Sequence, residues 1–107
     1  MDIELAARRL EALGNPTRLE IYRYLVRSGP AGRAVGDIQQ SLDIPGSTLS
    51  HHISKLVWVG LVEQERQGRT LICRPNFAAM NEAVGFLLDE CCADAPEDAE
   101  KPTGTSA

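Results

Sequence analysis

Two adjacent cysteines close to the C-terminus have the most distinctive chemistry in the chain. They stand in the segment "DECCAD", at 89–94, and a third cysteine, Cys73, lies upstream. Thiolates are soft ligands that select soft, thiophilic ions. Neighbouring residues of a helix point about 100° apart, so fraying of the last turn would let both sulfurs reach one atom. Cys73, Cys91 and Cys92 are therefore the candidate ligands of such an ion.

The charges around the cysteine pair argue against an easily oxidised dithiol. We expect Cys91 and Cys92 to close a helix, where the helix dipole and the nearby carboxylates of Asp89, Glu90 and Asp94 disfavour thiolate. Reactive thiols instead need a neighbouring cation or a helix N-terminus. A strongly bonding ion can still displace the protons. For Cys73, simple packing is an equally open interpretation, because it shares a strand face with Leu71.

A predicted helix over about 46–59 has one apolar and one polar face. Its apolar positions recur at helical spacing, and the buried stripe contains Leu49, His52, Ile53, Leu56 and Val57. Because His52 lies on this stripe, we expect it to pack or to form a core hydrogen bond. The sequence leaves open whether Trp58 anchors the helix end or lies exposed.

The opposite face of this helix carries small hydroxyls, an imidazole and one cation, and no carboxylate. Such a face can approach DNA phosphates and base edges. Two arginines flank the tip of a predicted hairpin, where they can reach the DNA backbone or minor groove. The predicted DNA-binding residues are Ser47, Thr48, Ser50, His51, Lys55, Arg66 and Arg69.

Capping and helix-breaking residues predict the elements that position these side chains. Asp2 caps a helix that ends before Gly14, and Asn15 and Pro16 open the next. The remaining predicted elements are a short helix over 35–42, the helix over 46–59, a hairpin turning at 67–69, and a last helix from Asn76 to about Cys91. The fold is therefore mainly α with a small β-hairpin, a winged helix-turn-helix.

Three segments resemble one known family. "LGNPTRLEIYRYLV", "STLSHHISKLVWVGLVEQERQGRTLICR" and the terminal helix are similar to the ArsR/SmtB-type repressors, over about residues 2–92. The resemblance implies a cytoplasmic homodimer built on the first and last helices. Such a dimer binds a palindromic operator in double-stranded DNA and releases it when an inducer binds.

Within this family, the cysteines resemble those of arsenical-sensing members. The third helix has no cysteine and the last helix has no histidine, so the inducer sites that other members build there are absent. The resemblance implies a trivalent arsenical, inorganic or methylated, as inducer, with no permanent cofactor. The alternative is a redox or reactive-sulfur-sensing repressor of the same fold.

Composition agrees with one intracellular domain and an acidic tail. Residues 89–107 carry a net charge of −5, whereas residues 1–88 carry +1, so the overall charge of −4 does not exclude a nucleic-acid partner. We expect a domain over 1–92 and a disordered tail over 93–107, with no membrane segment. No Cys/His pairing or Gly-rich phosphate loop favours an enzyme. A winged helix used only for protein contacts is a third interpretation.

Overall fold

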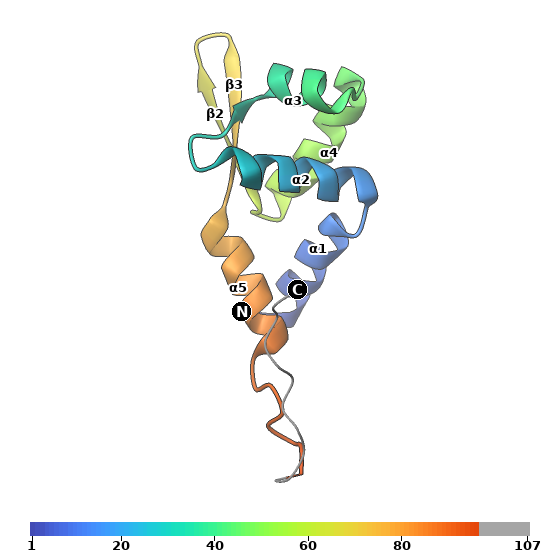
Figure 1. The fold of residues 1–107 in the computed structure, drawn as a ribbon, viewed down its shortest axis with the longest axis vertical. Helices are drawn as coiled ribbons and strands as arrows, with labels where there is room; N and C mark the ends of the chain where they lie inside the picture. The colour runs from blue at the N-terminus through green and yellow to red at the C-terminus, as the bar shows by residue number, and fades with distance from the viewer. Residues whose placement is uncertain (97–107) are drawn as a thin grey trace.

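The computed structural model of the chain describes residues 1–96. Five helices and a three-stranded sheet follow one another along the chain (Figure 1). They are α1 (Ile3–Leu13), α2 (Pro16–Ser28), β1 (Arg33–Ala34), α3 (Val35–Leu42), α4 (Gly46–Trp58), β2 (Val62–Gln67), β3 (Thr70–Pro75) and α5 (Phe77–Leu88). Most of the predicted tail, 97–107, lies outside the described residues, so its disorder stays a prediction.

The predicted caps form the expected hydrogen bonds. The Asp2 carboxylate accepts from the Glu4 N–H at 3.0 Å. The Asn15 amide oxygen accepts from the N–H groups of Thr17 and Arg18, at 2.9 and 3.1 Å. Asn76 begins α5 in the same way, through the N–H of Ala79. These bonds satisfy N–H groups that a helix leaves without a partner, which is why the helix starts were predictable.

The sheet contains a third strand, β1, in addition to the two of the predicted hairpin. Its order is β1-β3-β2, and both pairs are antiparallel. β1 has two residues, and Arg33 pairs with Cys73. A strand this short has no periodicity to recognise. Gly32 precedes it with a φ of 79°, and a Cβ there would lie 2.4 Å from the Cys73 carbonyl oxygen, so this approach requires glycine.

The core lies where α2, α3, α4 and the base of the hairpin meet. α4 contributes Leu49, Ile53 and Leu56, which are buried as predicted. The fully buried set also includes Ile21, Leu25, Ile38, Leu61, Val62 and Cys73. The core therefore fixes α4 against the hairpin and leaves its polar side outward.

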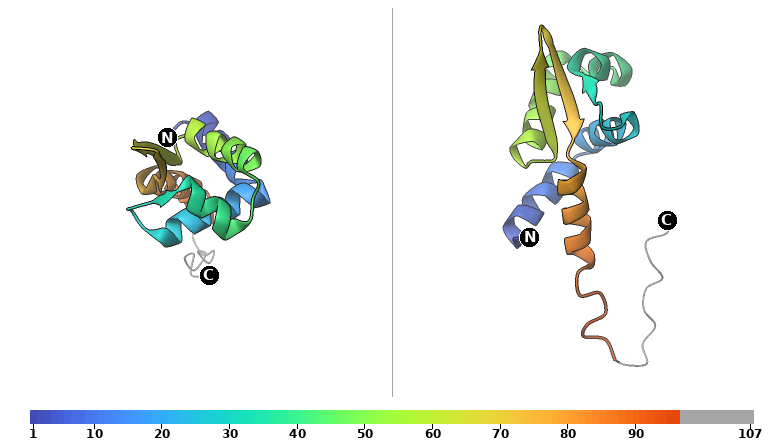
Figure 2. Two further views of the ribbon diagram at one scale, coloured as in Figure 1. Left: turned by 90° about the horizontal axis from the view of Figure 1, so that it is seen from above. Right: turned by 90° about the vertical axis from the view of Figure 1, so that its left-hand side faces the viewer.

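The helices α1 and α5 lie at the opposite end of the molecule from the hairpin tip (Figure 1 and the right-hand view of Figure 2). Small side chains, Ala6 and Ala83, are buried on these two helices. Much larger apolar side chains remain exposed on them, namely Ile3, Leu10, Phe77, Val84, Leu87 and Leu88. These six residues form the exposed apolar surface of the α1–α5 end.

The last helix is shorter than predicted. α5 ends at Leu88, and Asp89 adopts an extended backbone conformation. Two further residues, Glu90 and Cys92, have left-handed φ values of 57° and 63°. Acidic residues disfavour a helix C-terminus, and the last turn of α5 carries no basic residue to oppose them. Cys91 and Cys92 therefore lie in turns beyond the helix, and the prediction that they close it is wrong.

No helix among residues 1–96 is long and apolar enough to cross a membrane.

Candidate nucleic-acid interface and cysteine site

The polar face of α4 is open to solvent over its whole length. The exposed residues on it are Ser47, Thr48, Ser50, His51, Ser54 and Lys55. The turn that precedes α4 carries one exposed acid, Asp43, at the C-cap of α3. The structure thus places all five predicted base-reading and phosphate-binding residues of this helix on one accessible surface.

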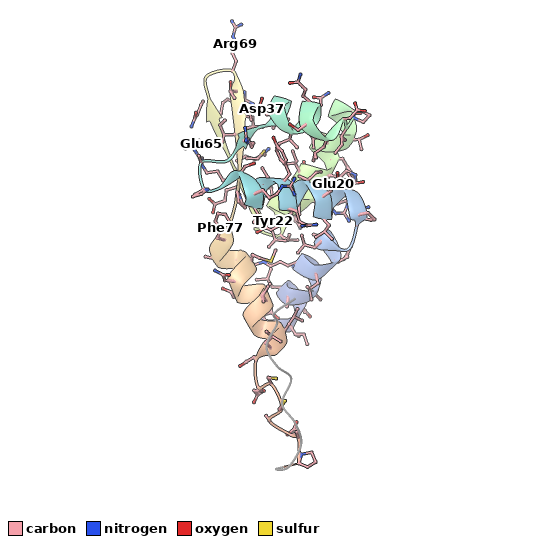
Figure 3. All side chains as sticks on the ribbon, viewed as in Figure 1. Glu20, Tyr22, Asp37, Glu65, Arg69 and Phe77 are labelled. Atoms are coloured by element: carbon pink, nitrogen blue, oxygen red, sulfur yellow. The ribbon has the colours of Figure 1, made fainter. Side chains whose placement is uncertain are left out.

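The hairpin carries two arginines beside this surface. Arg66 lies on β2. Arg69 follows the left-handed Gly68 in the turn, and its side chain extends outward beyond the hairpin tip (Figure 3). The carboxylate of Glu65 is held by Gln67 at 2.7 Å and by Arg74 at 3.2 Å. The hydrogen bond from Gln67 makes the largest contribution to lowering the pKa of the Glu65 carboxyl. The hydrogen bond and charge of Arg74 lower this pKa further. Within residues 1–96, Arg66 and Arg69 form no ion pair, so their charges remain available.

A buried arginine supports α4 from behind. Arg18 donates through Nε to the Ala12 carbonyl oxygen at 2.6 Å, and through Nη1 to His52 Nδ1 at 3.3 Å. Arginine can only donate, so Nδ1 of His52 accepts and the ring is neutral in this contact. Partial burial, and then the charge of Arg18, lower the pKa of His52. His52 therefore forms the core hydrogen bond that its place on the stripe predicts. No local pattern in the sequence indicates the role of Arg18 as the residue that links α1, α2 and α4.

Trp58, at the end of α4, does not anchor the helix. It is 86% exposed. This settles the alternative that the sequence left open.

Cys73 has a different environment from the other two cysteines. It lies on β3 with no exposed surface and belongs to the core. Burial raises the pKa of its thiol, and a hydrogen bond from Gln64 at 3.5 Å opposes that rise only in part. Packing thus accounts for Cys73 within one chain, and its predicted role as a ligand stays a prediction.

Cys91 and Cys92 form a close pair beyond α5. Their sulfurs are 3.5 Å apart, and the Cys91 side chain is exposed. The hydrogen bond with Cys91 raises the pKa of Cys92. Backbone turns hold the segment, from Cys91 N–H to Leu88 at 3.1 Å and from Ala93 N–H to Glu90 at 2.9 Å. Residues 1–96 contain no group of three or more His, Cys, Asp or Glu side chains placed to hold a metal. One chain therefore offers at most these two sulfurs together.

Comparisons with known proteins agree with this arrangement. A family model described as a helix-turn-helix domain matches residues 13–65. The nodulation protein NolR of Rhizobium meliloti is 35% identical over 101 residues, which cover 94% of this chain and 80% of NolR.

Two solved structures share the fold. An ArsR-like transcriptional regulator from Rhodococcus sp. RHA1 is 26% identical, with a TM-score of 0.73 over 86% of this chain and 83% of that one. A homodimeric winged helix-turn-helix DNA-binding domain from Mycobacterium bovis, a possible ArsR-family regulator, is 26% identical, with a TM-score of 0.67 over 91% of this chain and 90% of that one.

The two solved structures are described as an ArsR-like transcriptional regulator and a possible ArsR-family regulator with a DNA-binding domain, in agreement with the expectation that the chain is not an enzyme. With NolR matched at 35% identity over four-fifths of its length, and with the winged helix-turn-helix in place, the chain belongs to the ArsR/SmtB family of transcriptional regulators.

Proposed function

We propose that the protein is a cytoplasmic repressor that binds operator DNA as a homodimer, with α4 in the major groove. The observation that carries this proposal is the exposed, acid-free face of α4, next to the free arginines of the hairpin. Thr48 and His51 would meet base edges, and Lys55 a phosphate. Arg66 and Arg69 would hold the backbone or enter the minor groove farther along the duplex.

The dimer follows from the exposed apolar surface of the α1–α5 end. Ile3 and Leu87 are 71% and 58% exposed, which is unusual for large apolar side chains on one side of a small domain. A second copy would cover this surface and set two recognition helices apart by one turn of DNA, about 34 Å. The homodimeric relative from Mycobacterium bovis supports this arrangement.

Operator binding is tested with DNA from the promoter of the protein's own gene. Lys55→Ala and Arg69→Ala should weaken binding to all sequences and reduce the slope of log K against log salt by about one each. Changes at Thr48 or His51 should instead alter which bases matter. If both charge variants bind like wild type, the docking model is wrong. Sedimentation of a folded monomer at micromolar concentration would rule out the dimer.

We further propose that the inducer is a trivalent arsenical held by Cys91 and Cys92. Two sulfurs 3.5 Å apart, each about 2.3 Å from a common atom, subtend an angle of about 100°. This angle suits a pyramidal trivalent centre with two sulfur ligands and one further substituent. The exposure of Cys91 allows entry without unfolding. A methylated arsenical needs only these two thiols.

Because Cys73 has no exposed surface, it can join the site, from the partner subunit, only after movement of the core around it. Three single Cys→Ser variants decide this, with arsenical-induced release of DNA as the measurement. Loss of release in the Cys91 and Cys92 variants alone indicates a two-thiol site. Loss in all three indicates a third thiol from Cys73. Normal release from the Cys91→Ser/Cys92→Ser double variant would exclude an arsenical site at the pair.

The second candidate is a redox or reactive-sulfur switch at the same pair. The short distance between the two sulfurs favours it, because they need little movement to bond. The raised pKa of Cys92 opposes it, because the thiolate is the reactive form. Release of DNA by a mild oxidant or a persulfide donor, with no response to arsenicals, would support the switch over the arsenical site.

A further inference from the structure

A basic cleft lies between α1 and α4, on the side of the molecule where α4 is exposed. Its volume is about 470 Å³. α1 and the start of α2 contribute Arg8, Glu11 and Arg18, and α4 contributes His51, Lys55 and Trp58. Because His51 and Lys55 also belong to the predicted DNA-binding residues, the cleft continues that surface toward the α1–α5 end.

The cleft has more positive than negative charge. Arg8 and Lys55 are exposed, and Arg18 lies behind them with 8% of its surface accessible. Arg18 forms no ion pair with any residue of 1–96, and Glu11 is the one acid among the residues that line the cleft. An anion is therefore the ligand that the charges favour.

Three hydrogen bonds fix the walls of the cleft relative to each other. Arg9 on α1 donates through Nε to the Val59 carbonyl oxygen, just after α4, at 2.9 Å. Arg18 donates to Ala12 at the other end of α1 and contacts His52 on α4. These bonds thus fix the placement of the α1 and α4 backbones that carry Arg8 and Lys55.

Arg8 lies on a different side of α1 from the exposed apolar surface that a second copy would cover. It lies five residues after Ile3, which is about 140° around the helix axis. Ile3 and Leu10 share one side of α1 and form part of the exposed apolar surface. The same helix can therefore bind a second copy on one side and an anion on another.

Trp58 adds an apolar wall to the cleft. It is 86% exposed, and the core described above does not include it. An exposed indole at the end of a recognition helix can pack on deoxyribose next to a bound phosphate. Contact with a sugar would explain the exposure of Trp58, which packing within the chain does not.

We propose that the α1–α4 cleft holds a backbone phosphate of the operator, with Arg8 and Lys55 as its cations and Trp58 against the adjoining sugar. The proposal rests on the proposed DNA-binding function and extends it to α1. α1, which forms one wall of the cleft, lies toward the end of the molecule opposite the hairpin tip (Figures 1 and 2). The cleft would therefore bind the duplex near the centre of a two-fold operator, and the hairpin would bind its outer flank.

The test compares Arg8→Gln with Arg23→Gln, a matched control. Arg23 is an exposed arginine on α2 that lines a separate surface with Leu19 and Arg27. Fluorescence anisotropy with promoter DNA is measured across a salt series. Arg8→Gln should reduce the salt slope by about one and weaken binding by about five- to tenfold at 0.1 M salt. Trp58→Ala should weaken binding with little change in slope, and Arg23→Gln should match wild type.

Phosphate ethylation interference then locates the contact. Ethyl groups that block the wild type but not Arg8→Gln should cluster near the operator centre, whereas those relieved by Arg69→Ala should lie on the flanks. If Arg8→Gln has the slope and affinity of Arg23→Gln, or relieves only flanking phosphates, the inference is overturned. If Arg69→Ala and Lys55→Ala also bind like wild type, the proposed function itself fails.

Discussion

The recognition helix and the cysteine turn differ in what holds them. α4 is fixed by three buried side chains, by the Arg18–His52 contact and by Arg9 at its end. The turn after α5 is held by local backbone hydrogen bonds, and its residues are largely exposed. A surface that must match DNA needs a rigid support, whereas a turn that captures a ligand can reorganise around it. The proposed DNA contact therefore lies in a region held by the core, and the proposed inducer site lies in a region held only by local bonds.

The largest effect on stability is expected from removing core volume under α4, because the core supports the recognition helix. Leu56 has no exposed surface, and Leu56→Ala should lower the free energy of unfolding by about 3 kcal/mol and weaken operator binding. Urea denaturation at fixed protein concentration measures the loss. Thr48→Ala, on the exposed face of the same helix, is the control and should change stability by less than about 0.5 kcal/mol. Equal losses in the two variants would show that the core does not support α4 as described.

The sequence predicted α2 and the recognition helix α4 well because each has a clear local signal. Asn15 and Pro16 mark one helix start, the apolar spacing of Leu49, Ile53 and Leu56 marks the buried side of α4, and the structure contains each. Helices and caps depend on local residues, so local patterns can identify them. The exposed residues of α4 follow directly once its buried side is known.

The end of α5 was harder to predict because two local signals disagree there. The apolar spacing continues from Leu87 and Leu88 to Cys91 and favours a longer helix, whereas the acids at 89 and 90 disfavour it. The structure follows the charges. β1 and the role of Arg18 could not be predicted either, because both depend on contacts between segments far apart in the sequence.

Changes at the cysteines should have a smaller effect on stability, and that effect should differ between the core and the turn after α5. Cys73→Ser places a hydroxyl in the core and should lower the free energy of unfolding by about 1–2 kcal/mol. Cys91→Ser lies in an exposed turn and should cost less than about 0.5 kcal/mol. A thiol reagent should label Cys91 and Cys92 in the native protein and reach Cys73 only after unfolding. Rapid native labelling of three thiols would contradict the burial of Cys73.

The smallest effect concerns the contact between Arg18 and His52 behind α4. Burial and the Arg18 charge lower the folded-state pKa of His52 below its ordinary value of 6.5. The unfolded chain therefore binds this proton first as the pH falls. Stability contributed by neutral His52 is complete above about pH 6.5 and is lost as the pH falls from there through the lower folded-state pKa. Denaturation series between pH 5 and 7.5 should show this loss in the wild type and a smaller one in His52→Gln. His51→Gln keeps the Arg18–His52 contact and should retain most of the pH dependence. If His52→Gln keeps the wild-type dependence and His51→Gln removes it, the titrating group lies on the DNA-facing side of α4 and not in its support.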